Sequence, residues 1–184
     1  MWGGSKVYSN STTDAQIKGF VNFTNNAYTD TNANLINYYQ YTADTGANIV
    51  FNVMDYTLPI ADPPIYDEIN RIEGKIADTT RIAELSSYTD ELSSTDQRNR
   101  NIFLTITFDN DEAMYRDAVT ISNSYLQPFL NLKGLTWSLL FQPIPRLVSD
   151  ISIKQGGNIM GVDRNKGNLV RKSCISLFEI SSII

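Results

Sequence analysis

Histidine is absent from this chain of 184 residues, and cysteine occurs only once, at Cys174. Without histidine, the chain cannot contain a Ser-His-Asp or Cys-His catalytic device, nor a zinc site with histidine ligands. A single cysteine can form neither an internal disulfide nor a metal site built from several thiolates. The sequence therefore excludes hydrolases of those two types and structural zinc modules.

Long apolar runs and clusters of positive charge are also missing. No stretch reaches the roughly 18 apolar residues that a membrane-spanning helix needs, so we expect no membrane span. The 15 Lys and Arg residues are scattered and are outnumbered by 20 Asp and Glu residues, which gives a net charge of −5. Because no basic stripe is present, we expect neither a nucleic-acid nor a membrane partner.

The first residues lack the basic segment and following apolar stretch that define a signal peptide. Two N-glycosylation sequons occur nevertheless, at Asn10-Ser11-Thr12 and Asn22-Phe23-Thr24. They favour a secreted parent protein, but they leave the localisation of this chain itself open.

What the sequence does contain is an alternation of strand and helix signals. With 42% hydrophobic residues, the chain is apolar enough for one domain with a sizeable core. No glycine-rich turn follows a strand in the way that a doubly wound nucleotide-binding sheet requires. We therefore predict an α+β domain in which helices pack on one face of an antiparallel sheet. The expected strands cover 3–9, a hairpin at 34–60 broken by "ADTGAN", 100–110 and 135–145, with an extended segment from 158; the expected helices cover 11–28, 61–72, parts of 78–95, 109–134 and 146–158.

Two of the expected strands have faces of different character. In "TWSLLFQ", Trp137, Leu139 and Phe141 share an apolar face, and the opposite face is partly polar. In "IFLTITF", an aliphatic face is likewise opposed by a mixed one. The mixed faces form either a solvated surface or the wall of a ligand cavity. Their residues are Thr136, Ser138, Leu140 and Gln142 in the first strand and Phe103, Thr105 and Thr107 in the second.

Three further groups of residues have two interpretations each. Asp109, Asp111 and Glu112 are either a cation site or, as we favour, the cap and first turn of a helix. Tyr38, Tyr39 and Tyr41 either stack on a bound ring or pack across neighbouring strands. Trp2-Gly3-Gly4 is either a turn that approaches a phosphate or, as we favour, a tight bend that leads into a strand.

Taken together, "WGGSKVYS", "DTTRIAELSSYTDEL" and "LFQPIPRLVSDISIKQGGNIMGVDRNKGNL" resemble a known family. They are similar to the substrate-binding half of fungal FAD-linked oxidoreductases with an FAD-binding PCMH-type domain. These enzymes belong to the vanillyl-alcohol oxidase superfamily, near berberine-bridge-type and 6-hydroxynicotine-oxidase-like enzymes. The resemblance runs from Met1 to about Val170 and includes a "GGNxxG" stretch formed by Gly156, Gly157, Asn158 and Gly161.

The resemblance implies a substrate-binding (cap) domain whose open sheet face covers the flavin. The parent enzyme would oxidise a small organic substrate by hydride transfer to FAD, and its FAD-binding domain is expected to be the missing partner. The resemblance implies that this chain alone binds no FAD and is inactive, so whether it is itself an enzyme is left open. No catalytic residue is assigned, because the strand that carries the base in the family is expected to be absent. The substrate-binding candidates are Gln142, Ser138, Thr105, Thr107 and Phe103.

Residues 171–184 do not share the resemblance and are expected to be a non-family tail. Arg171-Lys172-Ser173 can be encoded with the bases GTAAGT, a common intron donor sequence, so the tail is interpreted as a translated intron. Met1 is correspondingly expected to be an internal methionine, which makes the chain a fragment truncated at both ends. Two alternatives stay open: an independent ligand-binding or interaction module, and a non-functional fragment from an incorrect gene model.

Overall fold

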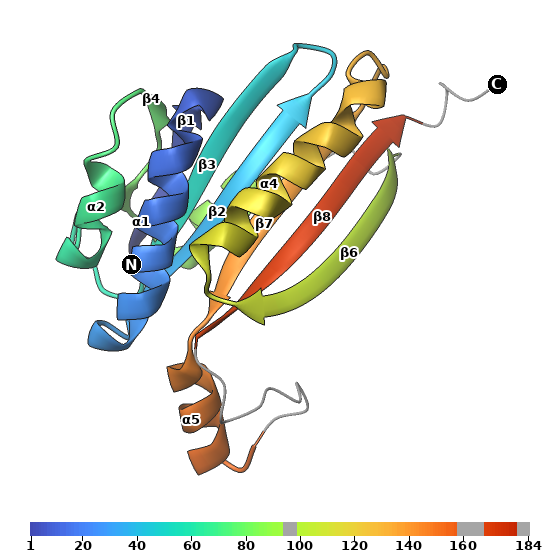
Figure 1. Cartoon of the computed structure of the whole chain (residues 1–184). Coiled ribbons are helices and arrows are strands. Elements are labelled where there is room, and N and C mark those ends of the chain that lie inside the picture. The colour runs from blue at the N-terminus through green and yellow to red at the C-terminus, as the bar shows by residue number, and fades with distance from the viewer. Residues whose placement is uncertain (94–98, 158–167, 180–184) are drawn as a thin grey trace.

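One antiparallel sheet of eight strands forms the centre of the computed structural model (Figure 1). The structure describes residues 1–93, 99–157 and 168–179, with only the backbone described for 99–100 and 173–179. The strands follow the order β4-β1-β3-β2-β7-β8-β6, and β5 pairs with β1 at the end of β4. Their bounds are β1 Trp2–Ser9, β2 Ala33–Thr42, β3 Ala47–Tyr56, β4 Lys75–Asp78, β5 Arg81–Ile82, β6 Asn99–Asp109, β7 Thr136–Ile144 and β8 Leu169–Glu179.

Helices cover one face of this sheet, as Figure 1 shows for α1 and α4. Short 3₁₀ turns extend α1, α2 and α4, which keeps these segments close to the strands they connect. The helices are α1 Thr13–Asn26, α2 Asp67–Asn70, α3 Leu85–Leu92, α4 Glu112–Leu126 and α5 Arg146–Lys154. The predicted α+β class and the antiparallel sheet are confirmed. Among the described residues, no helix combines the length and the apolarity that crossing a membrane would require.

The core between sheet and helices is built around Phe141 of β7, which is fully buried. Its ring lies 4.9 Å from that of Tyr115 on α4 and 6.3 Å from that of Phe20 on α1. Edge-to-face aromatic pairs of this kind stabilise a core beyond the area they bury. Phe141, Leu139 and Trp137 therefore form the helix-facing side of β7, as the alternation of the sequence predicts.

The hairpin predicted at 34–60 is confirmed by β2 and β3, which pair without a break from Ala33 with Tyr56 to Thr42 with Ala47. Gly46 closes the turn with a φ of 65°, a conformation that glycine adopts at no steric cost. The register places Tyr38 opposite Phe51. This pair sets the centre of the sheet face that the helices leave uncovered.

Two smaller predictions concern the start of α4 and the end of α5. The Asp111 side chain accepts hydrogen bonds from the Ala113 and Met114 amides, so it caps α4. Gly156 and Gly157, with φ values of 104° and 92°, end α5 as expected. No group of potential metal ligands occurs in the described part of the chain.

The Gly3-Gly4 pair lies inside β1, so the predicted bend before the strand is wrong. A Cβ on Gly3 would lie 2.5 Å from the Met54 carbonyl oxygen, and one on Gly4 would lie 2.7 Å from that of Thr79. The glycines therefore allow neighbouring backbones to approach β1 closely. Of the "GGNxxG" stretch, Asn158 and Gly161 lie outside the described residues.

A strand also occupies the segment where a family strand was expected to be missing. β8 lies between β7 and β6, and pairs with both, from Leu169 with Ile144 and Asp109 to Leu177 with Thr136 and Asn101. The uncharged run that follows Lys172 and the free edges of two long strands favour this pairing. The origin of residues 171–184 stays a prediction, and 180–184 lie outside the described residues.

Candidate functional site

The sheet face opposite α1 and α4, here called the open face, carries the second set of alternating side chains. Leu140 pairs with Tyr38, and Tyr38 pairs with Phe51, which itself pairs with Val7. Directly opposed residues of antiparallel strands point to the same side of a sheet, so these four form one row across β7, β2, β3 and β1. The row is apolar except for one phenol.

A groove of about 590 Å³ lies over this row. Its floor is the open face, and its wall comes from Thr79 and from Glu91 and Leu92 at the end of α3. Thus α3 differs from α1 and α4, because its C-terminal end borders the open face. The lining among the described residues, called the open-face groove below, is Ser5, Val7, Ile36, Tyr38, Gln40, Phe51, Val53, Thr79, Glu91, Leu92 and Leu140.

Tyr38 supplies the central polar group of the groove. Its hydroxyl donates a hydrogen bond of 2.8 Å to Ser138 Oγ, and its ring lies 5.7 Å from the Phe51 ring. Burial raises the pKa of Tyr38, and the hydrogen bond to Ser138 opposes this shift only in part. Tyr38 is therefore a neutral phenol near neutral pH, positioned by its contact with Ser138.

The rim of the groove carries an ion pair. Glu91 forms an ion pair of 2.6 Å with Arg81 and accepts a hydrogen bond from Thr79. Burial raises the pKa of Glu91, but Thr79 and Arg81 outweigh that effect and lower it overall. No lysine or arginine belongs to the described lining. The groove thus fits an uncharged planar ring better than a diphosphate, which requires cationic or amide donors.

The five substrate-binding candidates all point to the open face, but the structure does not gather them in the groove. Ser138 is buried beneath Tyr38. Thr105, Thr107 and Phe103 are exposed on β6, which β8 separates from β7. Gln142 lines a different cavity, where β2 and β8 begin and β7 ends. Their role in binding substrate stays a prediction.

Tyr38 and Phe51 line the groove but were not among the five substrate-binding candidates. Stacking on a ligand and packing across strands were both open for Tyr38, Tyr39 and Tyr41. The structure separates the three, because Tyr39 is buried on the helix side and Tyr41 donates to the Leu130 carbonyl oxygen. The alternation of side chains along the two hairpin strands could have identified this pair, since it places Tyr38 and Phe51 on the same face.

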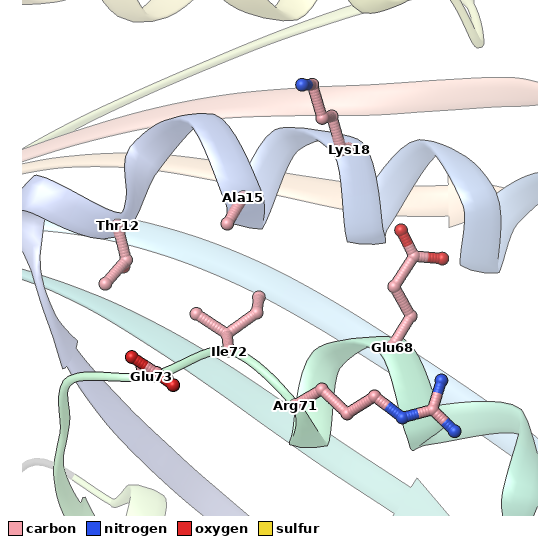
Figure 2. A pocket seen from close by; sticks show the side chains of 7 residues that line it. All are labelled: Thr12, Ala15, Lys18, Glu68, Arg71, Ile72 and Glu73. Carbon is pink, nitrogen blue, oxygen red and sulfur yellow. The ribbon is translucent and has the colours of Figure 1, made fainter.

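A third cavity, of about 420 Å³, lies outside the sheet between α1 and the α2 segment. Figure 2 shows Ile72 pointing toward α1 among charged side chains of both signs. Two cations, Lys18 and Arg71, are balanced there by Glu68 and Glu73. This balance favours no particular ligand charge, so the open-face groove is the stronger candidate site.

Comparison with known proteins gives relatives and a fold match. No protein-family model matches the chain. It is 30% identical over 173 residues to the FAD-dependent monooxygenase drtC of Aspergillus calidoustus, covering 92% of this chain and 33% of that protein. It is 29% identical to the FAD-dependent monooxygenase sdcF of Emericella nidulans, covering 92% of this chain and 36% of that one. The chain thus spans about a third of the length of these curated relatives.

Among solved structures, the chain matches 6-hydroxy-D-nicotine oxidase from Arthrobacter nicotinovorans with a TM-score of 0.69. All of this chain and 39% of the oxidase are covered, at 10% sequence identity. At this identity the match describes the fold alone. It places the antiparallel sheet and its helices in a known architecture.

Proposed function

Because these relatives and this fold confirm the resemblance to fungal FAD-linked oxidoreductases, we propose that the chain forms the substrate-binding part of such an enzyme. The proposed reaction oxidises a small organic substrate by hydride transfer to flavin. The observation that carries the proposal is the open-face groove, whose volume of about 590 Å³ lies in the range of small-molecule sites. The proposed partner of the chain is an FAD-binding domain that docks against the open face.

The residues of the groove fit the binding of a planar ring. Phe51 and Leu140 provide apolar contact, and the neutral Tyr38 phenol provides a hydrogen-bonding group at their centre. Bound FAD would supply the hydride acceptor and return its electrons to oxygen or another acceptor. The chain itself orients the substrate and excludes water from one side. Without lysine or arginine in the described lining, we expect it to hold no FAD tightly when alone.

The same groove supports a second candidate, an independent ligand-binding module. A half-buried apolar floor can bind a small molecule without any redox partner. The two candidates differ in what a flavin domain adds. An oxidoreductase part gains turnover when that domain is present, whereas an independent module gains nothing.

The test reconstitutes the proposed enzyme. The Aspergillus calidoustus relative is produced without the third that matches this chain, loaded with FAD and mixed with the purified chain in the absence of oxygen. A panel of small phenols and alcohols is then added, and the visible absorbance of the flavin is followed. We expect at least one compound to bleach the flavin only when both parts are present.

Two variants make this test specific for the groove. Val7→Trp fills part of the groove and should slow the bleaching by at least about tenfold, because it competes with the substrate for space. Ile121→Trp adds the same ring to an exposed position on α4 and should leave the rate unchanged. Saturable binding of a panel compound without bleaching of the flavin would favour the independent module. If no compound bound and none bleached the flavin, both the oxidoreductase part and the independent module would be contradicted.

A further inference from the structure

A second cavity on the described part of the molecule differs from the open-face groove in charge. It lies where β2 and β8 begin and β7 ends, next to the end of α1 and the start of α5, and has a volume of about 380 Å³. We call it the end pocket. Its lining is Phe23, Ala27, Thr31, Ala33, Asn34, Gln142, Pro143, Ile144, Pro145, Leu147, Val148 and Arg171.

The deeper wall of the end pocket is apolar and rigid. Phe23 and Ala27 of the α1 end are buried, and Phe23 is held by the Tyr66 ring, stacked at 5.5 Å. On the opposite side, Pro143 and Pro145 restrict the backbone that leads into α5. The pocket therefore has a preformed apolar compartment large enough for a small ring or a branched chain.

The mouth of the pocket carries a positive charge without a hydrogen-bond or ion-pair partner among the described residues. Arg171 is exposed, and the described hydrogen bonds and ion pairs include none to its guanidinium group. In the sheet, β8 places Arg171 between Gln142 and Thr107, its register partners on either side. The Arg171 and Gln142 side chains thus start from neighbouring positions on one face.

Two carboxylates on the elements that line the pocket have other partners. Asp55 accepts a hydrogen bond of 3.2 Å from Asn34, and burial raises the pKa of Asp55. Asp150 on α5 lies 3.6 Å from the Arg146 guanidinium. Arg171 is therefore left as the cation of this pocket, with its planar set of donors available to a ligand.

We propose that the end pocket binds the carboxylate of a small hydrophobic acid. The Arg171 guanidinium holds the carboxylate through paired N–H donors, and the Gln142 amide adds a third donor beside it. The apolar part of the acid lies against Phe23, Ile144 and Leu147. The end pocket shares no lining residue with the open-face groove, so the proposal does not depend on flavin chemistry.

The test compares benzoate with benzamide, which has the same ring and nearly the same shape but no charge. Each is titrated into the purified chain, and binding is measured by isothermal titration calorimetry. We expect benzoate to bind at least about tenfold more tightly than benzamide to the unchanged chain. Arg171→Gln should remove that preference, and Arg171→Lys should keep part of it, because lysine retains the charge but not the paired donors.

Two further variants protect the test against misfolding. Arg71→Gln removes an exposed cation from the α1–α2 cavity and should leave benzoate binding unchanged. Leu147→Trp should weaken benzoate binding while Arg171 stays in place, because the added ring fills the apolar compartment. Equal affinity for benzoate and benzamide, or full benzoate binding by both Arg171→Gln and Leu147→Trp, would overturn the proposal. Neither result concerns flavin bleaching, so a failure here is distinct from a failure of the proposed oxidoreductase.

Discussion

Lys6 shows how a single residue connects β1 to the segment between β3 and β4. Its side chain is buried on the helix side of β1, where Nζ lies 2.7 Å from Asn70 Oδ1, 3.3 Å from Asp62 Oδ1 and 3.8 Å from Asp78 Oδ2. A buried ammonium group requires such partners, because removing it from water is otherwise costly. We therefore expect Lys6→Met to lower the free energy of unfolding by about 2 kcal/mol, as measured by urea denaturation at neutral pH.

The same substitution should change how stability depends on acid. Burial would raise the pKa of Asp78, but hydrogen bonds from Lys75 and Thr80 and the charge of Lys6 lower it to about 2. A carboxyl whose pKa is lowered by folding stabilises the protein above its unfolded pKa, and that stabilisation is lost as pH falls toward 2. Lys6→Met should reduce this loss. Lys75→Met removes a half-exposed partner of Asp78 and should reduce the acid-dependent loss at least as much, because its hydrogen bond lowers the pKa of Asp78 more than the charge of Lys6 does. At neutral pH it is the matched control for burial, and a loss of unfolding free energy equal to that of Lys6→Met would contradict the buried role of Lys6.

At the scale of elements, β6 presents an apolar sequence at the edge of the sheet. Its helix-side residues Ile102, Leu104 and Ile106 are 51%, 66% and 56% exposed. The sequence "IFLTI" is nearly palindromic, so antiparallel pairing with a second copy centred on Leu104 would place Ile102 against Ile106 of the copy. Unprotected edge strands of this kind pair readily. We expect the chain to self-associate through β6.

Leu104→Lys should weaken this self-association by at least about tenfold in sedimentation experiments, because a charge at a strand edge opposes pairing. Ile76→Lys makes the same change on β4, at the other end of the sheet order, and should have no effect. If only Ile76→Lys lost self-association, the contact would lie at β4 and the prediction for β6 would be wrong. A chain that stays monomeric at every concentration would contradict the prediction entirely.

The elements also show which parts of the fold the sequence could predict. Alternation predicts the faces of β6 and β7, and the Asp111 cap predicts the start of α4, because both signals are local. β4 and β5 were missed, since they have only four and two residues and their strand conformation depends on pairing with distant β1. The candidate residues shared a face as predicted. The groove itself was beyond prediction, because it depends on which strands are neighbours and on where α3 ends.

The whole molecule depends on a core that is rich in buried phenols. Tyr8, Tyr66 and Tyr115 are at most 1% exposed, and Tyr39 is 7% exposed. Burial, with a smaller contribution from the charge of Asp78, raises the pKa of Tyr8 to about 12. Burial likewise raises the pKa of the other three well above the ordinary value of 10.0. The core therefore holds several tyrosines that stay protonated in the folded chain but ionise near that value in the unfolded one.

This difference fixes the direction of the alkaline pH dependence. Below a pH of about 10, both states hold the phenolic protons, and the full stability is present. Above it, the unfolded chain releases them while the folded chain retains them, so the free energy of unfolding should fall as pH rises. Urea denaturation at neutral pH and at a pH of about 11 measures the loss. Phenolate absorbance should rise in two phases, the exposed tyrosines first and the buried ones together with unfolding.

Tyr39→Phe is the variant that separates this effect from ordinary packing. The Tyr39 hydroxyl is buried and has no hydrogen-bond partner among the described residues, so removing it leaves the ring contacts with Phe141 intact. An unsatisfied buried hydroxyl is costly, and we expect the variant to be as stable as the unchanged chain, or more stable by about 1 kcal/mol, at neutral pH. With one fewer buried phenol, its stability should also fall less steeply above a pH of about 10. A steeper alkaline loss, or a large destabilisation at neutral pH, would show that the Tyr39 hydroxyl has a partner in solution and that the core is not closed around it.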